Sequence, residues 1–384
     1  MAQKRAIFQE VAAGEAVITP GAAIGAIDRG RTAWRGAIRV WLQSLFLLVV
    51  LMIAVGGATR LTDSGLSITE WRPVTGALPP LSAEEWQLEF DKYREIPEYQ
   101  LQNKGMSLAE FKVIYWWEWG HRQLGRFIGL VWGLGFFTFL ALRRIPTGWT
   151  GRLLLLGAFG GLQGAIGWWM VASGLTGTMV DVASYRLATH LGLAFVILGL
   201  IAWNIVELGR TDRDLIQARR AREPGLRRLG TILCVFTFVQ ILLGAFVAGI
   251  DAGRAYTDWP LMSGGFFPPN MWDFSPVWRN FFENSGLVQF IHRTSGYLLL
   301  LFGLYTWYVS RRSPNQATRR AFDWATLVLF SQMIIGIVTL INAAPVTLAL
   351  MHQFCAVVLW VLVLRARFLT QYPIEQSVRG GARA

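Results

Sequence analysis

The stretch WWEWGHRQLGR, from Trp116 to Arg126, stands at the start of a long apolar run and holds one of the chain's four histidines, His121. If this stretch is helical, Glu118 lies one turn before His121 and on the same face. Arg122 follows the histidine directly. The spacing therefore predicts a carboxylate, an imidazole and a guanidinium close together, where a helix enters an apolar environment.

The chain repeats this arrangement once, in LVQFIHRTSGY, where Gln289, His292 and Arg293 have the same spacing. The two remaining histidines, His190 and His352, each stand early in a later apolar run. The four histidines thus form two matched pairs, and this pairing is the main indication of function.

The composition indicates a membrane protein, because 53% of the 384 residues are hydrophobic and only 16% are charged. Apolar runs of about 18 or more residues are typical of membrane-spanning helices. We expect eight such helices, at residues 38–58, 122–142, 153–172, 187–206, 229–250, 287–309, 324–341 and 347–364. The net charge of +12 fits arginines gathered on the cytoplasmic side, and no motif supports nucleic-acid binding.

Arginine-rich loops alternate with arginine-poor ones along the chain. The two tails and the loops after the second, fourth and sixth predicted helices are basic, whereas the other loops are not. The positive-inside rule then puts both termini in the cytoplasm and every histidine at the outer end of an even-numbered helix. We expect an integral protein of the bacterial inner (cytoplasmic) membrane.

The two halves of the chain resemble each other. DSGLSITEW, beginning at Asp63, matches DAGRAYTDW, beginning at Asp251, and Gln163 matches Gln332. The pattern predicts an all-α fold of two tandem, pseudo-symmetric four-helix bundles, related by an axis along the membrane normal. The expected parts are an N-terminal tail (1–37), a first half (38–208) with a long outer loop (59–118), a basic linker (209–228), a second half (229–367) and a C-terminal tail (368–384).

Two histidines from two helices, without a third ligand or a nearby cysteine, suit the axial positions of a haem better than a tetrahedral zinc. Arg122 and Arg293 stand where haem propionates would emerge, and a guanidinium pairs well with carboxylates. The alternatives are histidines that simply end helices at the interface and arginines that snorkel. No CxxCH motif occurs, and both cysteines, Cys234 and Cys355, lie within apolar runs.

The two halves differ at one polar position, because Glu118 of the first half corresponds to Gln289 of the second. An electron carrier with two equivalent haems has no need of this difference. An enzyme with one reactive and one supporting site would use it, since a carboxylate can stabilise a developing cation or move protons. The alternative is a glutamate that is solvated at a loop end.

With GGATRLTDSGLSITEW, EWGHRQLGR, THLGLAF, FIHRTSGY and LMHQ, nearly the whole chain resembles the haem A synthase family. The resemblance implies oxidation of the C8 methyl group of haem O to the formyl group of haem A, through successive hydroxylations, for cytochrome c oxidase assembly. It implies that His121 and His190 address the substrate haem O, with Glu118 in the reaction, and that His292 and His352 bind haem b as cofactor. Some members carry a cysteine pair in the first outer loop, which this chain lacks.

The resemblance also implies the lipid bilayer, haem O synthase and an electron partner as interaction partners. The sequence does not identify the electron partner, and it leaves open whether copies of the chain form a homo-oligomer. Two other functions stay in play: a di-haem b subunit for electron transfer, and a haem transporter or chaperone. The difference between Glu118 and Gln289 favours the enzyme over both.

Overall fold

The computed structural model describes residues 26–374, which form helices and loops without a β-strand. Eight of the described helices are long and apolar enough to cross a membrane. They are α1 (Ala26–Leu61), α4 (Leu108–Ala141), α5 (Thr150–Val171), α6 (Ser184–Leu208), α8 (Pro224–Gly249), α10 (Ser285–Ser310), α11 (Gln316–Ile341) and α12 (Val346–Gln371). The prediction of an all-α membrane protein with eight spans is confirmed. The outer parts of both predicted tails, residues 1–25 and 375–384, lie outside the described residues.

Most of these helices extend beyond their apolar runs, and the longest extensions are in α1, α4, α11 and α12. α11 begins at Gln316 rather than at residue 324. α1 begins at Ala26 rather than at residue 38, and α12 continues to Gln371 rather than ending at residue 364. α4 begins at Leu108 rather than at residue 122, because Ser107 caps it. The Ser107 hydroxyl accepts from the backbone N–H of Glu110, whose carboxylate accepts from the Ser107 N–H (2.8 Å). Residues 108–121 and the second apolar run therefore form one continuous helix.

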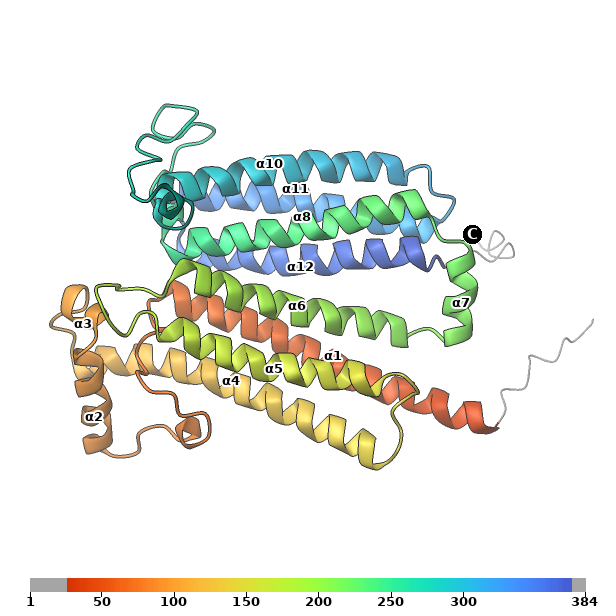
Figure 1. Cartoon of the computed structure of the whole chain (residues 1–384), viewed down its shortest axis with the longest axis horizontal. Coiled ribbons are helices and arrows are strands. Elements are labelled where there is room, and N and C mark those ends of the chain that lie inside the picture. The colour runs from red at the N-terminus through yellow and green to blue at the C-terminus, as the bar shows by residue number, and fades with distance from the viewer. Residues whose placement is uncertain (1–25, 375–384) are drawn as a thin grey trace, which may run out of the picture.

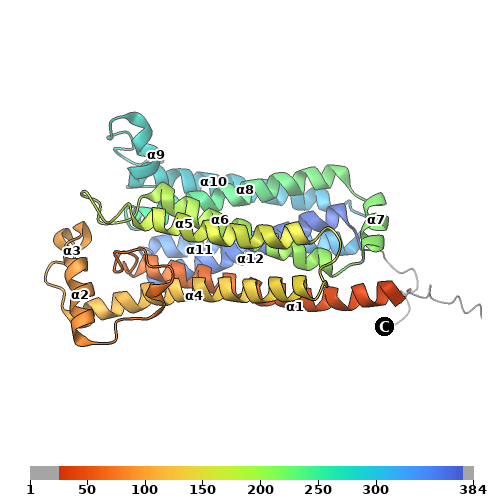
Figure 2. The same ribbon diagram turned by 60° about the horizontal axis from the view of Figure 1, so that its bottom comes forward.

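A small aromatic domain covers one end of the bundle. α2 (Ala83–Arg94) begins at a capping box of Ser82 and Glu85. α3 (Pro97–Leu101), which periodicity did not indicate, follows directly and begins at a proline. α2 packs against the first turns of α4, which project beyond the other long helices, and α3 packs on α2 (Figure 2). The buried aromatic residues at this contact are Trp86, Phe90, Tyr93, Tyr99, Phe111 and Tyr115.

The remaining short helices lie in loops. α7 (Asp212–Arg220) lies in the basic linker at the opposite end of the bundle from α2 and α3 (Figure 1). Its Thr211 cap was not anticipated, because the charges around it suggest an irregular loop. Four single-turn helices complete the fold: η1 (Thr75–Ala77), η2 (Ala252–Arg254), η3 (Val277–Arg279) and α9 (Asn280–Glu283).

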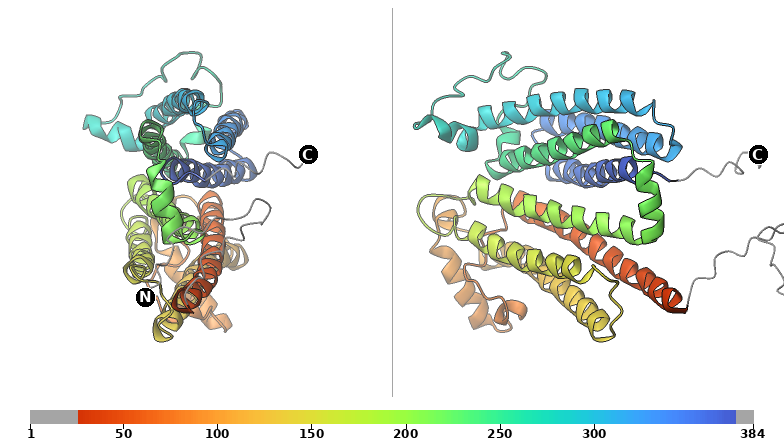
Figure 3. Two further views of the ribbon diagram at one scale, coloured as in Figure 1. Left: turned by 90° about the vertical axis from the view of Figure 1, so that its right-hand side faces the viewer. Right: turned by 45° about the vertical axis from the view of Figure 1, so that its right-hand side comes forward.

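The long helices form two groups of four that lie side by side when viewed along the bundle (Figure 3, left). In the first group α1 packs on α4, α4 on α5, α5 on α6 and α6 on α1. In the second group α8, α10, α11 and α12 contact one another in the same cyclic order. Between the groups α6 packs on α8 and α1 on α12, and the Trp360 indole N–H donates to the Phe195 carbonyl oxygen (2.9 Å).

Candidate haem-binding site

The four histidines lie on α4, α6, α10 and α12, and each is partly buried. Each imidazole edge packs against a glycine of the neighbouring helix. A Cβ atom at these glycines would stand 2.8–3.1 Å from the imidazole Cε1, which is closer than side chains normally approach. The pairs are His121 with Gly56, His190 with Gly167, His292 with Gly244 and His352 with Gly336. The same local arrangement therefore occurs four times, twice in each half.

In the second half, His292 and His352 face each other, with ring centroids 6.5 Å apart and ring planes at 83°. A metal–imidazole bond is about 2.0–2.1 Å long, so two imidazoles on opposite sides of one metal ion have centroids roughly 6–7 Å apart. The buried Nδ1 of His352 has no hydrogen-bond partner among the described residues. The residues present thus fit a haem iron with two axial histidines.

In the first half, His121 and His190 lie close enough for their charged forms to repel each other. The buried Nδ1 of His121 likewise has no hydrogen-bond partner within the described part of the chain. Both predicted pairs are therefore brought together, one within each group of four helices.

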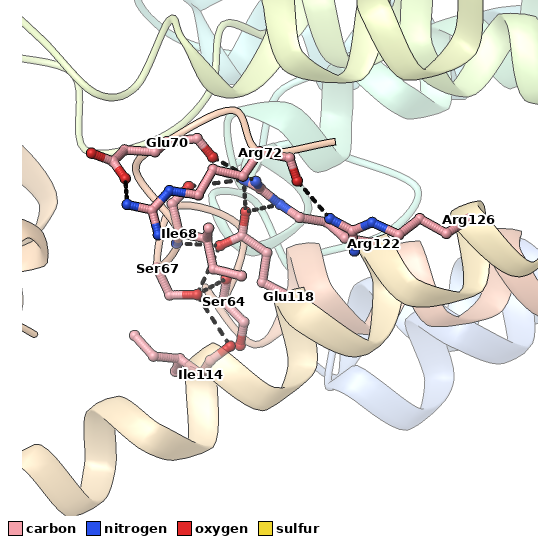
Figure 4. Close-up of polar contacts among 9 residues, drawn as sticks. All are labelled: Ser64, Ser67, Ile68, Glu70, Arg72, Ile114, Glu118, Arg122 and Arg126. Carbon is pink, nitrogen blue, oxygen red and sulfur yellow. Dashed lines mark hydrogen bonds and ion pairs between the residues drawn. The ribbon is translucent and has the colours of Figure 1, made fainter. Parts of the chain in front are cut away.

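Glu118 lies one turn before His121 on α4 and is only 3% exposed. Its Oε2 accepts from the Ser67 hydroxyl and from the Ile68 backbone N–H, both at 2.7 Å. Its Oε1 accepts from Nε (3.0 Å) and Nη2 (2.5 Å) of Arg122 (Figure 4). The carboxylate is therefore not solvated at a loop end, because it is buried and holds the segment that follows α1.

Comparison with known proteins gives the same indication as these pairs of histidines. A model of the cytochrome oxidase assembly protein family matches residues 39–364. The chain belongs to this family. Curated relatives named haem A synthase include proteins of Dinoroseobacter shibae (69% identical) and Paracoccus denitrificans (59% identical). In both cases the alignment covers 99% of this chain and at least 99% of the relative.

In this member of the family, Gln289 occupies the position of Glu118 in the second half and makes contacts of opposite polarity. Its Nε2 donates to the carbonyl oxygens of Ala252 (2.6 Å) and Tyr256 (3.2 Å), and its Oε1 accepts from Arg293 (2.9 Å). Glutamate faces donors in the first half, whereas glutamine faces acceptors in the second. The exchange of glutamate for glutamine therefore fits the loop in each half: a backbone N–H donates to Glu118, whereas backbone carbonyl oxygens accept from Gln289.

Arg122 and Arg293 each donate to backbone carbonyl oxygens of a loop, the first at residues 68–70 and the second at residues 256–261. Besides Glu118, Arg122 donates to the carbonyl oxygens of Ile68 (2.8 Å) and Glu70 (3.1 Å). Arg293 donates to Tyr256, Asp258 and Leu261 carbonyl oxygens, while its buried Nε has no partner among the described residues. A guanidinium has five N–H groups, so each arginine has one left for a further acceptor.

Sequence reasoning missed an amide next to three of the four histidines. Gln163 and Gln332 were noted only as matching positions, and nothing drew attention to Gln240. Each amide nitrogen donates to the backbone carbonyl of its histidine at 2.9–3.0 Å and lies 3.1–3.4 Å from an imidazole nitrogen. Their position one turn before a glycine that contacts the same imidazole is the signal that could have identified them.

An ion cluster joins the two halves at the end of the bundle where α1 ends. Arg60, at the end of α1, donates to Asp63 (2.9 Å) and to Asp251 (2.9 Å), and Asp181 is 3.3 Å away. Asp63 and Asp251, which match in the two halves of the sequence, have similar left-handed backbone conformations, with φ of 49° and 50°. Nearby, burial raises the pKa of the Glu98 carboxyl to about 8, and the charge of Asp181 adds to the effect.

Proposed function

We propose that this chain is a haem A synthase, which oxidises the C8 methyl group of haem O to the formyl group of haem A through hydroxylated intermediates. The observation that carries the proposal is the pair of neighbouring histidines in each half, with ring centroids 6.5 Å apart in the second half, in a chain that belongs to the cytochrome oxidase assembly family. The names of relatives that align over almost the whole chain support it.

In this proposal the two halves have different tasks. His121 and His190 hold the substrate haem O, and His292 and His352 hold haem b as a resident cofactor. When bound, haem b supplies a centre for electron transfer. The glycines opposite the imidazoles let the helices approach and fix each imidazole edge, which orients the ring for axial ligation.

Glu118 is the proposed catalytic carboxylate of the first half. Its place one turn before His121 puts a buried negative charge near the rim of the substrate site, where it favours an electron-poor carbon during oxidation of the methyl group. Arg122 and the Ser67–Ile68 segment hold the carboxylate in place by hydrogen bonds. The proposed role of Arg122 and Arg293 toward haem propionates requires only the one N–H group that each retains.

We further infer that the halves are pseudo-symmetric units, residues 38–208 and 229–367, joined by the linker at 209–228. The identical cyclic order of helix contacts supports this. The described ends of α1 and α12 lie at the same end of the bundle as α7, as expected if both termini are cytoplasmic in a bacterial inner membrane (Figure 1). Haem O synthase as the source of substrate, a separate electron partner and assembly into a homo-oligomer complete the proposal.

The experiment is haem analysis. The chain is produced in a host that makes haem O but lacks haem A, and membrane haems are separated by chromatography. Haem A in the presence of the chain, together with haem b in the purified protein, supports the synthase. Haem b alone at two per chain would indicate an electron-transfer subunit instead, and bound haem O without conversion would indicate a transporter or chaperone.

A further inference from the structure

The four histidines are not held equally. Gln163 contacts His190, Gln240 contacts His292 and Gln332 contacts His352, and each glutamine also bonds the backbone carbonyl of that histidine. No hydrogen bond joins the imidazole of His121 to another described residue, and its Nδ1 is buried. One histidine of the first half therefore lacks the amide that the other three have.

The position of the missing amide is occupied by Met52. On α8, Gln240 lies one turn before Gly244, the glycine that faces His292. On α1, Met52 lies one turn before Gly56, the glycine that faces His121. The glycine four residues after each histidine confirms the correspondence: a Cβ at Gly296 would lie 3.3 Å from Gln240 Nε2, and one at Gly125 would lie 3.6 Å from Met52 Cε.

The difference has a physical consequence for a bound haem. A histidine that binds a metal through one nitrogen carries a hydrogen on the other, and a partner for that hydrogen fixes the ring and strengthens the ligand. The Oε1 atoms of Gln163, Gln240 and Gln332 are buried and without a partner, so rotation of each amide can present an acceptor. The thioether of Met52 is at best a weak acceptor and cannot replace the amide.

We propose that residues 52 and 240 decide which half releases its haem: Gln240 makes His292 a fixed ligand, whereas Met52 leaves His121 free to detach, so the first half exchanges its haem and the second retains it. This inference rests on the proposed function, in which one haem is substrate and leaves as product. It also gives a reason, independent of Glu118, for assigning the substrate to the first half.

The direct test measures haem loss rather than haem A formation. The purified full-length chain, loaded with haem b in both halves by incubation with excess haem, is mixed with apomyoglobin, and transfer is followed by absorbance. The unaltered chain should show one fast and one slow phase of equal amplitude. Loss of the hydrogen-bond partner of a metal-binding histidine typically weakens metal binding about 10–100-fold. Gln240→Met should therefore accelerate the slow phase by about tenfold or more.

The reverse variant, Met52→Gln, should slow the fast phase by a similar factor, and the protein should then purify with close to two haems per chain. Gln43→Met, at an exposed position of α1, is the matched control and should leave both phases unchanged. Electron paramagnetic resonance of the oxidised haem gives a second signal, because a freed His292 imidazole should broaden the low-spin spectrum of Gln240→Met.

Unchanged transfer rates and spectra in both variants would overturn the inference, as would equal acceleration of both phases by Gln240→Met. The outcome is separate from that of the proposed function. If the chain makes no haem A but the variants change the rates of the two haem-transfer phases as described, the inference stands and the proposed function is wrong. If the chain makes haem A but the variants leave these rates unchanged, the function stands and the inference is wrong.

Discussion

Replacing Glu118 by glutamine tests whether its charge acts in the reaction or only holds a loop. Glu118 accepts four hydrogen bonds, two from Arg122 and two from the Ser67–Ile68 segment. Glutamine has one accepting oxygen, which would remain with the arginine. Its amide group would then face the Ser67 hydroxyl and the Ile68 N–H, both of which donate to Glu118 in this structure.

The cost can be worked out from these contacts. Ser67 can adapt, because its hydroxyl can accept from the amide and donate to the Ser64 carbonyl, 3.1 Å away. The Ile68 N–H cannot adapt, and a buried donor without a partner costs about 1–3 kcal/mol. Weakening the charge-assisted bonds to Arg122 adds about 1 kcal/mol. We therefore expect Glu118→Gln to lower the local stability of the segment after α1 by about 2–4 kcal/mol without global unfolding.

Two measurements separate the roles. Hydrogen exchange should become faster in residues 62–72 of Glu118→Gln, and chromatography should show little haem A and an accumulation of haem O or a hydroxylated intermediate. Ser67→Ala is the control, because it removes the hydroxyl that contacts Glu118, Ser64 and Ile114 and keeps the charge of Glu118. It should raise exchange in the same segment while haem A formation largely persists.

The opposite results would refute the reasoning. Equal loss of haem A in Ser67→Ala and Glu118→Gln would mean that the carboxylate serves only to hold the loop. Normal haem A formation in Glu118→Gln would remove the carboxylate from the reaction altogether. Gln289→Glu gives a mirror test, because its carboxylate would face two carbonyl oxygens and should loosen the corresponding segment of the second half.

Three further predictions concern binding and stability. His292→Ala should remove most b-type absorbance of the purified protein, whereas loss of that absorbance in His121→Ala instead would mean that the halves are assigned in reverse. Gly336→Ala would place a Cβ 2.8 Å from the His352 ring, and this overpacking, which costs about 1–3 kcal/mol, should lower the haem content measured in absorbance titrations. Gly129→Ala is the control and should leave the haem content unchanged, because a Cβ there meets no atom within 4 Å. The pKa of Glu98 is raised in the folded state, so protonation of its carboxyl group favours folding. The stability that it contributes is complete below the unfolded-state pKa of about 4.3 and is lost as the pH rises through about 8. Limited proteolysis of the segment that contains α2 and α3 should therefore become faster as the pH rises between these values, and Glu98→Gln should flatten that pH dependence. An unchanged pH profile in Glu98→Gln would contradict this prediction.

The sequence predicted the eight spans because long apolar runs and capping boxes are local signals. It also suggested the two histidine pairs, because His121 and His190 stand at positions of the first half that correspond to those of His292 and His352 in the second. It could not predict where α1 begins or where α12 ends, since charged residues can continue a helix beyond the apolar core. The amides beside the histidines were missed because they come from other helices: Gln240 reaches His292 across more than fifty residues of chain, and only the packing of α8 on α10 brings them together.

The contacts of Glu118 show the same limit. Its spacing from His121 is visible in the sequence, but the Ile68 N–H that it accepts from is fifty residues away. Sequence comparison of the halves therefore pointed to a difference in chemistry, whereas the structure shows that the difference also matches donors in one loop and acceptors in the other. Both explanations predict loss of function in Glu118→Gln, and the Ser67→Ala comparison is needed for that reason.

The central claim is that this chain converts haem O to haem A. The most direct measurement is chromatographic separation of haems from membranes that contain haem O synthase, with and without this chain, followed by mass determination of each haem. A new haem that carries a formyl group in place of the C8 methyl group should form only when the chain is present, and it should be absent in the His121→Ala variant. Unaltered haem O in membranes that contain the folded, haem b-loaded protein would contradict it.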